Sequence, residues 1–533
     1  MDAAAQRKQL IEQLQGTEEW DLVIIGGGIT GAGILLRAAQ RGLKALLVEQ
    51  QDFAWGTSSR SSKMVHGGLR YLVNGDFALT RESVRERELL IKQLPGLVEP
   101  MSYLYAHYRW RWIERLGLHL ILKLYDLFAG RVTHSGLTAD QTRTLMPGIR
   151  DTDLVAGTRF EDAVTDDARL VLRTLDEACR LGAVAINYVQ VTQLLHRDGK
   201  VCGVEMTDRL EDRTLVVDAR CTVNACGTWV DRLWGESGGK ENGKQHRIRP
   251  LRGSHIVIPG DRLPIGTALA LPHPEDGRNV FIFPWEQTTV IGTTDLDHDQ
   301  PMEQEPVITR AELDYLLAAL RHQFPDLALE ETEILSTWSG VRPVISEKPG
   351  LSPSDEKREH EIWSEPGLVS VGGGKLTTFR VIADQVLERI AAQGLLPALK
   401  SDSVAMFKRE PTPPLPTGVD SGSWCRLLGR YGARLREWWS PDCDPGRVGN
   451  TPTLWCELGW AARAQSVVHL DDLLLRRTRI GVQLPRGGEA WLPRIKQLCQ
   501  PALGWSDEQW SAEEARYLEI IDRYYSLPEV KGG

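Results

Sequence analysis

The stretch DLVIIGGGITGAG, residues 21–33, decides the fold of this chain. Its apolar start is typical of a fully buried parallel strand, and the segment 29–41, rich in Ala, Leu and Ile, has the pattern of a helix. Between them Gly26, Gly28 and Gly31 form a G-x-G-x-x-G turn. Glycines permit a tight turn and a close approach of the backbone, and the helix N-terminus presents N–H groups to a pyrophosphate.

A carboxylate stands where such a motif needs one for a ribose. Residues 44–49, KALLVE, read as a second buried strand that ends in Glu49. An acid at this strand end accepts hydrogen bonds from ribose hydroxyls. With strand, helix and acid in place, the pattern predicts dinucleotide binding rather than an accidental glycine-rich turn. The acid favours a free 2′-hydroxyl over a 2′-phosphate, which leaves FAD and NAD as candidates.

Two further segments favour FAD over NAD. Residues 57–72, TSSRSSKMVHGGLRYL, offer donors suited to phosphate oxygens or to the polar edge of a flavin, although a solvated loop has the same composition. Residues 371–378, VGGGKLTT, form a second glycine-rich turn between a buried strand and a helix, so their N–H groups make another anion- or carbonyl-binding end. Two such turns far apart in the sequence predict one long cofactor held at both ends.

Composition narrows the class of protein. A chain of 533 residues, with 42% apolar and 25% charged residues, predicts a globular protein of about three domains. Its net charge of −9 argues against nucleic-acid binding. The eight cysteines form no CxxC pair and show no zinc spacing, so we expect free thiols and no metal. The polar N-terminus and the absence of an 18-residue apolar run predict a cytoplasmic chain with no signal peptide or spanning helix.

A series of sequence blocks along the chain resembles one known family. The 21–72 region, followed in order by VTDDARLVL, VNACGTWV, LRGSHIVIP, FIFPW, IGTTD, WSGVRP and GGKLTTFR, resembles the FAD-dependent glycerol-3-phosphate dehydrogenases that feed respiratory quinone. These blocks cover roughly residues 18–395, and LLLRRTRIG in the tail is similar to the family's C-terminal domain. The resemblance implies an α/β plus α+β protein with non-covalent FAD. It would have a glutathione-reductase-like Rossmann domain, an antiparallel substrate domain as in D-amino acid oxidase, and a C-terminal helical domain.

The expected domains follow from these blocks and from the proline-rich run PTPPLP at 411–416, a stiff, natural boundary. The FAD-binding domain is predicted to be discontinuous, with the other units inserted or appended. The ranges are 18–105, 150–235 and 345–400 for the FAD-binding domain, 106–149 and 236–344 for the substrate domain, 401–417 for the linker, and 418–533 for the helical domain. The role of the helical domain is left open between capping the FAD domain and stabilising a homodimer.

The resemblance also implies which residues bind the cofactor. Cys226 stands where flavoproteins of this class usually carry Thr, a departure of little cost if only backbone contacts matter. The ADP half is expected to be held by Gly26, Gly28, Gly31 and Glu49, and the approach to the flavin to be lined by Thr57, Ser58, Ser62, His66 and Gly67. The strand end near Cys226 contributes Gly227 and Trp229. The pyrimidine edge is expected to contact Lys375, Leu376 and Thr377.

The implied substrate, glycerol 3-phosphate, is a phosphate dianion with a secondary alcohol, so its site needs fixed cations, of which arginine is the better bidentate partner. The family match points to Arg70 with Tyr71, Arg342, Arg358 and Lys375. Taken singly, each arginine is more often a surface ion pair.

The implied reaction is hydride transfer from C2 to flavin N5, giving dihydroxyacetone phosphate. An alcohol gives up hydride readily only as its proton leaves, so a base near neutral pKa is needed. His255 is the first candidate for this base and His66 the second, while Lys375 and Arg342 would stabilise alkoxide charge. A histidine on a strand is also often purely structural.

The family passes its electrons to membrane quinone, ubiquinone or menaquinone. Segment 108–128, YRWRWIERLGLHLILKLYDLF, has Ile113, Leu116, Leu120, Leu124 and Leu127 on one helical face and basic and aromatic residues near its start. This pattern predicts an in-plane helix on anionic lipid, and hence a peripheral protein of the inner face of the cytoplasmic membrane. A helix packed on the protein's own core is the competing interpretation.

Two other functions stay open on the sequence alone. The chain could be an oxidase of the same fold that acts on an amine or a 2-hydroxy acid and reduces oxygen. It could also be a flavin-binding relative without turnover, because fold does not imply function.

Overall fold

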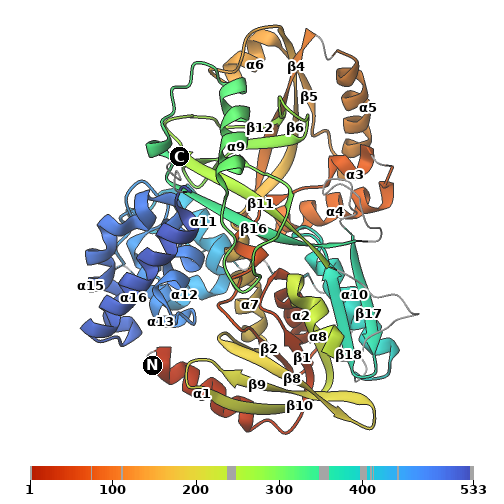
Figure 1. Ribbon diagram of the computed structural model, residues 1–533, viewed down its shortest axis with the longest axis vertical. Coiled ribbons are helices and arrows are strands. Elements are labelled where there is room, and N and C mark those ends of the chain that lie inside the picture. The colour runs from red at the N-terminus through yellow and green to blue at the C-terminus, as the bar shows by residue number, and fades with distance from the viewer. Residues whose placement is uncertain are drawn as a thin grey trace.

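The computed structural model describes residues 3–73, 75–109, 112–236, 248–346, 359–396, 405–408, 411, 413–440 and 443–528. Two sheets and a group of C-terminal helices build the molecule (Figure 1). The first sheet lies at the bottom of the view, the second at the top, and the C-terminal helices at the left beside both.

The first sheet forms because the apolar runs of the sequence become buried parallel strands. Its order is β17-β18-β10-β1-β2-β7, parallel from β18 to β7, with Ile24 of β1 paired to Val223 of β10 and to Leu47 of β2. The antiparallel β8–β9 hairpin continues from β10. The bounds are β1 Trp20–Ile25, β2 Ala45–Val48, β7 Val184–Ile186, β8 Val189–Arg197, β9 Lys200–Asp208, β10 Arg213–Asn224, β17 His360–Glu365 and β18 Leu368–Gly373.

Helices cover this sheet on both sides. On one side α2 (Ile29–Gln40) packs between α7 (Asp167–Arg180) and α10 (Phe379–Ala392), and their apolar residues share one core with Leu22 and Ile24 of β1. On the other side α1 (Ala3–Gln15) inserts Ile11 and Leu14 beside the remaining strand residues. The predicted strand, turn and helix around the first glycine motif are therefore present.

The second sheet is mostly antiparallel. Its order is β15-β11-β14-β13-β12-β4-β6-β3, with β16 paired to β11, β5 paired to β6, and one parallel contact between β12 and β4. Strands β4 and β6 join it, although the predicted FAD-binding domain includes most of both. The bounds are β3 Met64–Val65, β4 Val98–Tyr108, β5 Ser135–Thr138, β6 Leu154–Thr165, β11 Ile248–Pro259, β12 Ala268–Pro272, β13 Asn279–Trp285, β14 Thr288–Gly292, β15 Leu296–Asp297 and β16 Ser336–Ile345.

The helices around the second sheet begin at clear signals. Thr309 and Glu312 form a capping box that starts α9 (Arg310–Gln323), whose Leu313, Leu316 and Leu320 pack on the sheet. The other helices here are α3 Leu69–Val73, α4 Phe77–Gln93, α5 Trp112–Ala129, α6 Ala139–Leu145 and, at the edge of the first sheet, α8 Val230–Glu236.

The C-terminal helices share a core with the second sheet. Leu458 and Leu473 belong to the same buried cluster as Trp285 and Trp338 of that sheet. Buried ion pairs also join these helices to the first sheet: both carboxylate oxygens of Asp52 accept from Arg477, at 2.6 and 2.7 Å. The elements are α11 Ser421–Tyr431, α12 Leu435–Trp438, α13 Trp455–Ala464, the π-helix Asp472–Arg477, α14 Ile480–Gln483, the 3-10 segment Pro485–Trp491, α15 Leu492–Leu503, α16 Asp507–Ile520 and the π-turn Ile521–Tyr525.

Candidate active site

A cavity of about 420 Å³ lies along the ends of β1, β2 and β10. Residues from the turn after β1, the loop after β2, the start of β8, and the turns after β10 and β18 form its wall. The two glycine-rich turns predicted to hold one cofactor therefore open into the same space. The predicted cofactor residues in the wall are Gly26, Gly28, Glu49, Thr57, Ser58, Gly227, Trp229, Lys375 and Leu376.

The glycines of the first turn are required by close contacts. Gly26 has φ +114°, and a Cβ there would lie 2.6 Å from the carbonyl oxygen of Ala225. Gly31 is not in the wall, but its Cβ would lie 2.0 Å from the carbonyl oxygen of Gly26, so it lets α2 pack directly against the turn. At the start of α2, Ser58 Oγ accepts from Ile29 N at 3.0 Å, and the N-cap itself is Gly28.

Glu49 is fixed where the sequence predicts the ribose-binding acid. One carboxylate oxygen accepts from Gly27 N at 2.7 Å and the other from Gln51 N at 2.8 Å. Burial raises the pKa of Glu49, against the lowering effect of these two N–H donors. The side chain is thus oriented by the same glycine turn that forms the adjacent wall.

At the other end of the cavity, four predicted residues come together from two segments, 57–72 and 371–378. Lys375 Nζ lies 3.5 Å from the centre of the Tyr71 ring, and the rings of Tyr71 and His66 are 6.3 Å apart. Thr377 Oγ1 donates to His66 O and accepts from His66 N, both at 3.2 Å. Of these residues Lys375 is in the cavity wall. Lys375 therefore stands beside the cofactor space, with its ammonium against the ring of Tyr71.

His255 lies deeper. It is on β11, buried, with its ring stacked on Trp338 at 5.1 Å and Nε2 at 2.8 Å from Ser62 Oγ. Burial lowers the pKa of His255 well below 6.5, and the charges of Arg342 and Lys63 lower it further. The imidazole is consequently neutral at pH 7, as a general base must be, but its low pKa makes it a weaker base than the near-neutral one expected from the sequence.

Arg342, on the neighbouring strand β16, is already paired. Its Nη1 donates to Asp295 Oδ1 at 2.8 Å and its Nη2 to Thr293 Oγ1 at 3.2 Å, and its side chain is 22% exposed. The next residue, Pro343, reaches the cavity wall, whereas Arg342 and His255 are not in it. Arg358 and the side chain of Arg70 lie outside the described residues.

Comparison with known proteins decides the family. A model of the FAD dependent oxidoreductases matches residues 21–387, and a model of the C-terminal domain of alpha-glycerophosphate oxidase matches residues 375–510. A glycerol-3-phosphate dehydrogenase of Mycobacterium leprae is 34% identical, over 94% of this chain and 88% of that protein. An aerobic glycerol-3-phosphate dehydrogenase of Staphylococcus aureus is 35% identical, over 89% of each. This chain belongs to the FAD-dependent glycerol-3-phosphate dehydrogenase family.

Solved structures confirm the fold expected from the resemblance. The glycerol-3-phosphate dehydrogenase of Bacillus halodurans, solved in complex with FAD, superimposes with a TM-score of 0.78 at 29% identity, over 99% of this chain and all of that one. The L-alpha-glycerophosphate oxidase of Mycoplasma pneumoniae, at 19% identity and a TM-score of 0.58, shares the fold over 74% of this chain and 98% of its own.

The wall of the cavity fits the cofactor of this family. Among the residues that the structure describes, a Cβ built on Gly28 would have Ser58 Oγ, at 3.2 Å, as its one neighbour within 4 Å, and a Cβ on Gly227, whose φ is +58°, would have none. N–H groups at a helix start, hydroxyls, one carboxylate and one ammonium match a pyrophosphate, a ribose and the polar edge of a flavin. Cys226 also lines the wall and donates Sγ–H to Ile25 O, and burial of the sulfur raises the pKa of this half-buried thiol, so it takes the place of Thr as a neutral group. FAD is the cofactor of this protein.

Besides Gly31, four predicted cofactor residues are not in the wall: Ser62, His66, Gly67 and Thr377. Ser62 holds His255, as described above, and His66 and Gly67 sit one layer back. Gly67 N donates to Tyr125 Oη at 2.8 Å and to Asp162 Oδ1 at 3.1 Å. These hydrogen bonds hold the loop 57–68 in place. A sequence motif alone does not show whether a residue holds the loop or contacts the ligand.

Lys63 is a buried cation next to the candidate site that the sequence motifs do not single out. Its side chain is completely buried, with Nζ 2.8 Å from Asp167 Oδ1 and 4.6 Å from the centre of the Trp338 ring. Burial lowers the pKa of Lys63 to about 8. Both Lys63 and Asp167 lie inside sequence blocks that carry the family resemblance. Their place in these blocks is the sequence signal by which they can be found.

Proposed function

We propose that this protein oxidises sn-glycerol 3-phosphate to dihydroxyacetone phosphate by hydride transfer from C2 to N5 of FAD, and passes the electrons to a membrane quinone. The observation that carries the proposal is Lys375, a residue of the cavity wall whose ammonium is buried against the ring of Tyr71. A fixed cation beside the flavin space suits an anionic substrate.

The substrate-binding role proposed for the remaining cations follows from chemistry. Asp295 and Thr293 orient the guanidinium of Arg342, which would bind the phosphate together with Arg70, Tyr71 and Arg358. A guanidinium offers a planar pair of donors to phosphate oxygens, and Lys375 adds a point charge. This set would select a phosphorylated alcohol over its uncharged analogue.

In the proposed chemistry the C2–H bond breaks with both electrons, and the hydroxyl proton leaves to a base. Bound FAD supplies the two-electron acceptor. His255, held neutral by burial and by Arg342 and Lys63, would take the proton, with His66 as the alternative base. Lys375 and Arg342 would stabilise the negative charge that develops on the oxygen.

The first test compares substrates. Anaerobic mixing with glycerol 3-phosphate should bleach the flavin absorbance, whereas glycerol and lactate at the same concentration should not. Oxygen should then give little peroxide per turnover in the presence of a quinone analogue. Reduction by lactate or an amine with stoichiometric peroxide would instead establish an oxidase, and a flavin that no substrate reduces would establish a relative without turnover.

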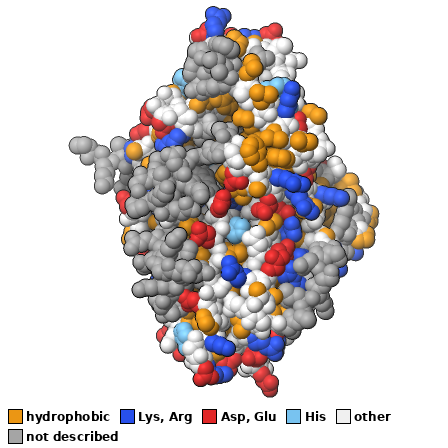
Figure 2. Space-filling view, turned by 90° about the vertical axis from the view of Figure 1, so that its right-hand side faces the viewer, with side chains coloured by type: hydrophobic (Ala, Val, Ile, Leu, Met, Phe, Trp, Pro, Cys, Tyr) orange, Lys and Arg blue, Asp and Glu red, His pale blue; other side chains and the backbone are white. Residues whose placement is uncertain are grey.

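We also propose that helix α5 places the protein on the inner face of the cytoplasmic membrane. Leu122 and Tyr125 of α5 are buried, while Leu116, Leu120 and Leu127 are 65%, 64% and 73% exposed. The helix thus has a side packed on the core, as the competing interpretation expects. It also has an exposed apolar side, as the lipid interpretation expects. Figure 2 faces the side of the molecule that carries α5, and hydrophobic side chains gather in its upper half.

Exposed leucines of this kind suit insertion into the boundary of the lipid headgroups. Arg109, 79% exposed, adds a positive charge near the start of the helix. Trp110 and Arg111 of the predicted segment, and the side chains of 112–115, lie outside the described residues. Within the described part of the chain, no helix combines the length and apolarity that a bilayer crossing requires.

Leu120→Glu is expected to weaken binding to anionic vesicles at low salt at least about tenfold, because burying one leucine contributes about 1.5–3 kcal/mol. Leu415→Glu, at a leucine 52% exposed in the proline-rich segment, is the matched control. Vesicle co-sedimentation measures both. Equal binding by the two variants, or a wild-type protein that stays in the supernatant, would contradict the membrane proposal.

A further inference from the structure

The loop 57–63, called here the flavin-facing loop, has two sides. Thr57, Ser58 and Ser61 line the cavity. The opposite side is buried against the C-terminal helices, which contribute no residue to the cavity wall among the residues described. The position of the loop, and thus of its hydroxyls against the cofactor, depends on what holds this buried side.

Arg479, between the π-helix 472–477 and α14, makes the direct contact. Its Nη2 donates to the carbonyl oxygen of Ser59 at 2.7 Å, and its Nη1 to the carbonyl oxygen of Leu475 at 2.7 Å. The side chain is 3% exposed, and the residue has a left-handed φ of +66°. One guanidinium therefore joins the backbone of the C-terminal helices to the backbone of the flavin-facing loop.

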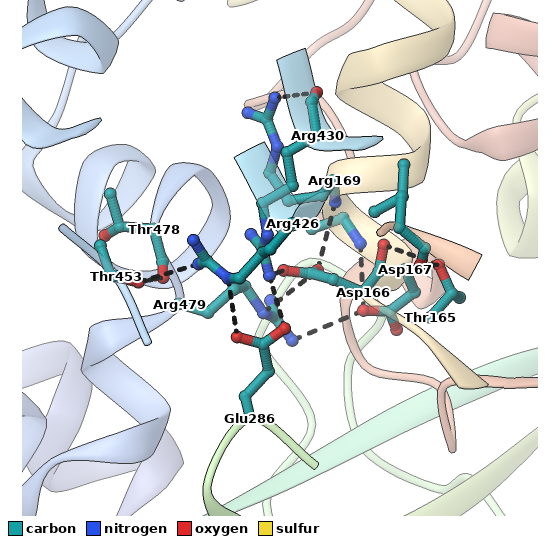
Figure 3. Close-up of polar contacts among 12 residues, drawn as sticks. Thr165, Asp166, Asp167, Arg169, Glu286, Arg426, Arg430, Thr453, Thr478 and Arg479 are labelled. Atoms are coloured by element: carbon teal, nitrogen blue, oxygen red, sulfur yellow. Dashed lines mark hydrogen bonds and ion pairs between the residues drawn. The ribbon is translucent and has the colours of Figure 1, made fainter. Parts of the chain in front are cut away.

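Two carboxylates at the start of α7 complete the attachment. Arg479 Nε is 3.7 Å from Asp166 Oδ1, and Nη2 is 3.5 Å from Asp167 Oδ1 (Figure 3). Asp167 Oδ2 accepts from both N and Oγ of Ser61, at 3.0 and 2.7 Å. Asp167 thus holds the loop at Ser61 while Arg479 holds it at Ser59.

Lys63 closes this cluster at the end of the loop. Its Nζ donates to Asp167 Oδ1 at 2.8 Å and to Ser59 O at 3.3 Å. Arg479 and Lys63 balance the two aspartates, all four side chains are buried, and Arg430 gives Asp166 a further partner at 3.0 Å. In such a place removal of one charge leaves the others uncompensated, so the loop should shift rather than merely loosen.

We propose that Arg479 is a positioning residue through which the C-terminal helices hold the flavin-facing loop against FAD. It touches neither cofactor nor substrate in this arrangement, and acts through Ser59, Ser61 and Asp167. The C-terminal helices thereby belong to the machinery that binds and tunes the flavin. The reduction-rate arm of the test rests on the proposed function, and the FAD-binding arm does not.

The test compares Arg479→Met with Arg426→Met in the full-length protein. Arg426, on α11, is the matched control because it also makes largely buried ion pairs, to Glu457 and Glu286 (Figure 3 shows the pair with Glu286), and its hydrogen bonds and ion pairs within the described chain do not include the loop. The readouts are the Kd for FAD, the fine structure of the bound flavin's absorption spectrum, and the reduction rate at saturating glycerol 3-phosphate. Tm is recorded for both.

Arg479→Met is expected to raise the Kd for FAD about tenfold and to lower the saturated reduction rate about tenfold, with KM changed less than about threefold, because a small displacement of a positioning element has effects of this size. Arg426→Met should lower Tm comparably and leave the Kd and spectrum unchanged. Arg479→Met with FAD affinity and spectrum like the wild type would overturn the proposal.

Arg479→Lys decides the matter if the methionine variant does not fold. Lysine keeps the charge beside the two aspartates but cannot donate to Ser59 O and Leu475 O together, so the Kd should rise at least about threefold. A wild-type Kd in the lysine variant would overturn the proposal. Wild-type protein that binds FAD but is not reduced by glycerol 3-phosphate would refute the proposed function and leave the FAD-binding arm intact.

Discussion

Replacing Gly31 by Val is expected to lower the affinity for FAD at least about a hundredfold and to leave a colourless protein. A Cβ at this position would lie 2.0 Å from the carbonyl oxygen of Gly26 and 3.4 Å from Ile24 Cγ2. Helix α2 would have to move away from the turn, and its N-terminal N–H groups would leave the pyrophosphate position. The measurement is FAD titration of the apoprotein by fluorescence, with circular dichroism to confirm folding.

Gly266→Ala is the control for this experiment, because a Cβ there would meet no atom of the described ranges within 4 Å. It should bind FAD like the wild type. A yellow Gly31→Val protein with a Kd within about threefold of the wild type would show that the turn tolerates displacement and that the glycine motif is not what holds the cofactor.

Replacing His255 by Asn is expected to lower the rate of flavin reduction by glycerol 3-phosphate about a hundredfold or more, the usual effect of removing a general base. Asparagine can keep a hydrogen bond to Ser62, so the change removes basicity more than structure. Stopped-flow absorbance under anaerobic conditions measures the rate, and FAD affinity should stay near the wild-type value.

His107→Asn provides the matched comparison. His107 is equally buried and makes the same type of bond, from Nε2 to Thr158 Oγ1 at 2.7 Å, on another strand of the second sheet. It should leave the reduction rate unchanged. A His255→Asn rate within about threefold of the wild type would remove His255 as the base, and His66→Asn would then be expected to show the loss.

The burial of His255 should also make the free energy of unfolding depend on pH. Its pKa in the folded state lies well below 6.5. As the pH falls below 6.5, His255 therefore becomes protonated in the unfolded chain while it is still neutral in the folded protein, which favours unfolding. The contribution of His255 to the free energy of unfolding is therefore complete above about pH 6.5 and diminishes below it.

Local signals in the sequence predicted the first sheet well. The strand before Gly26, the helix after it and the strand before Glu49 each stand in a contiguous apolar pattern. The membership of β4 and β6 was not predictable in this way. Tyr103 pairs with Phe160 across a long intervening segment, and a local pattern does not state which sheet a strand joins.

The candidate site follows the same division. Gly26 and Gly28 are needed for the backbone conformation of the turn, and Glu49 for its place at a strand end, and short sequence motifs express both requirements. All three residues line the cavity. The contact of Arg479 with Ser59 joins residues 420 positions apart, and no spacing rule predicts it. Nor does the sequence show that Asp295 would pair with Arg342, because that pairing depends on the register of the second sheet.

The ion pair of Asp52 with Arg477 has a consequence for biosynthesis. Asp52 leaves the ribosome 425 residues before its buried partner, a delay of about 20–85 seconds at 5–20 residues per second. Throughout that interval the nascent nucleotide-binding half carries an acidic group destined for the interior with no counter-ion to accompany it. The buried ion pair between the nucleotide-binding half and the C-terminal helices therefore cannot form until Arg477 has been synthesised.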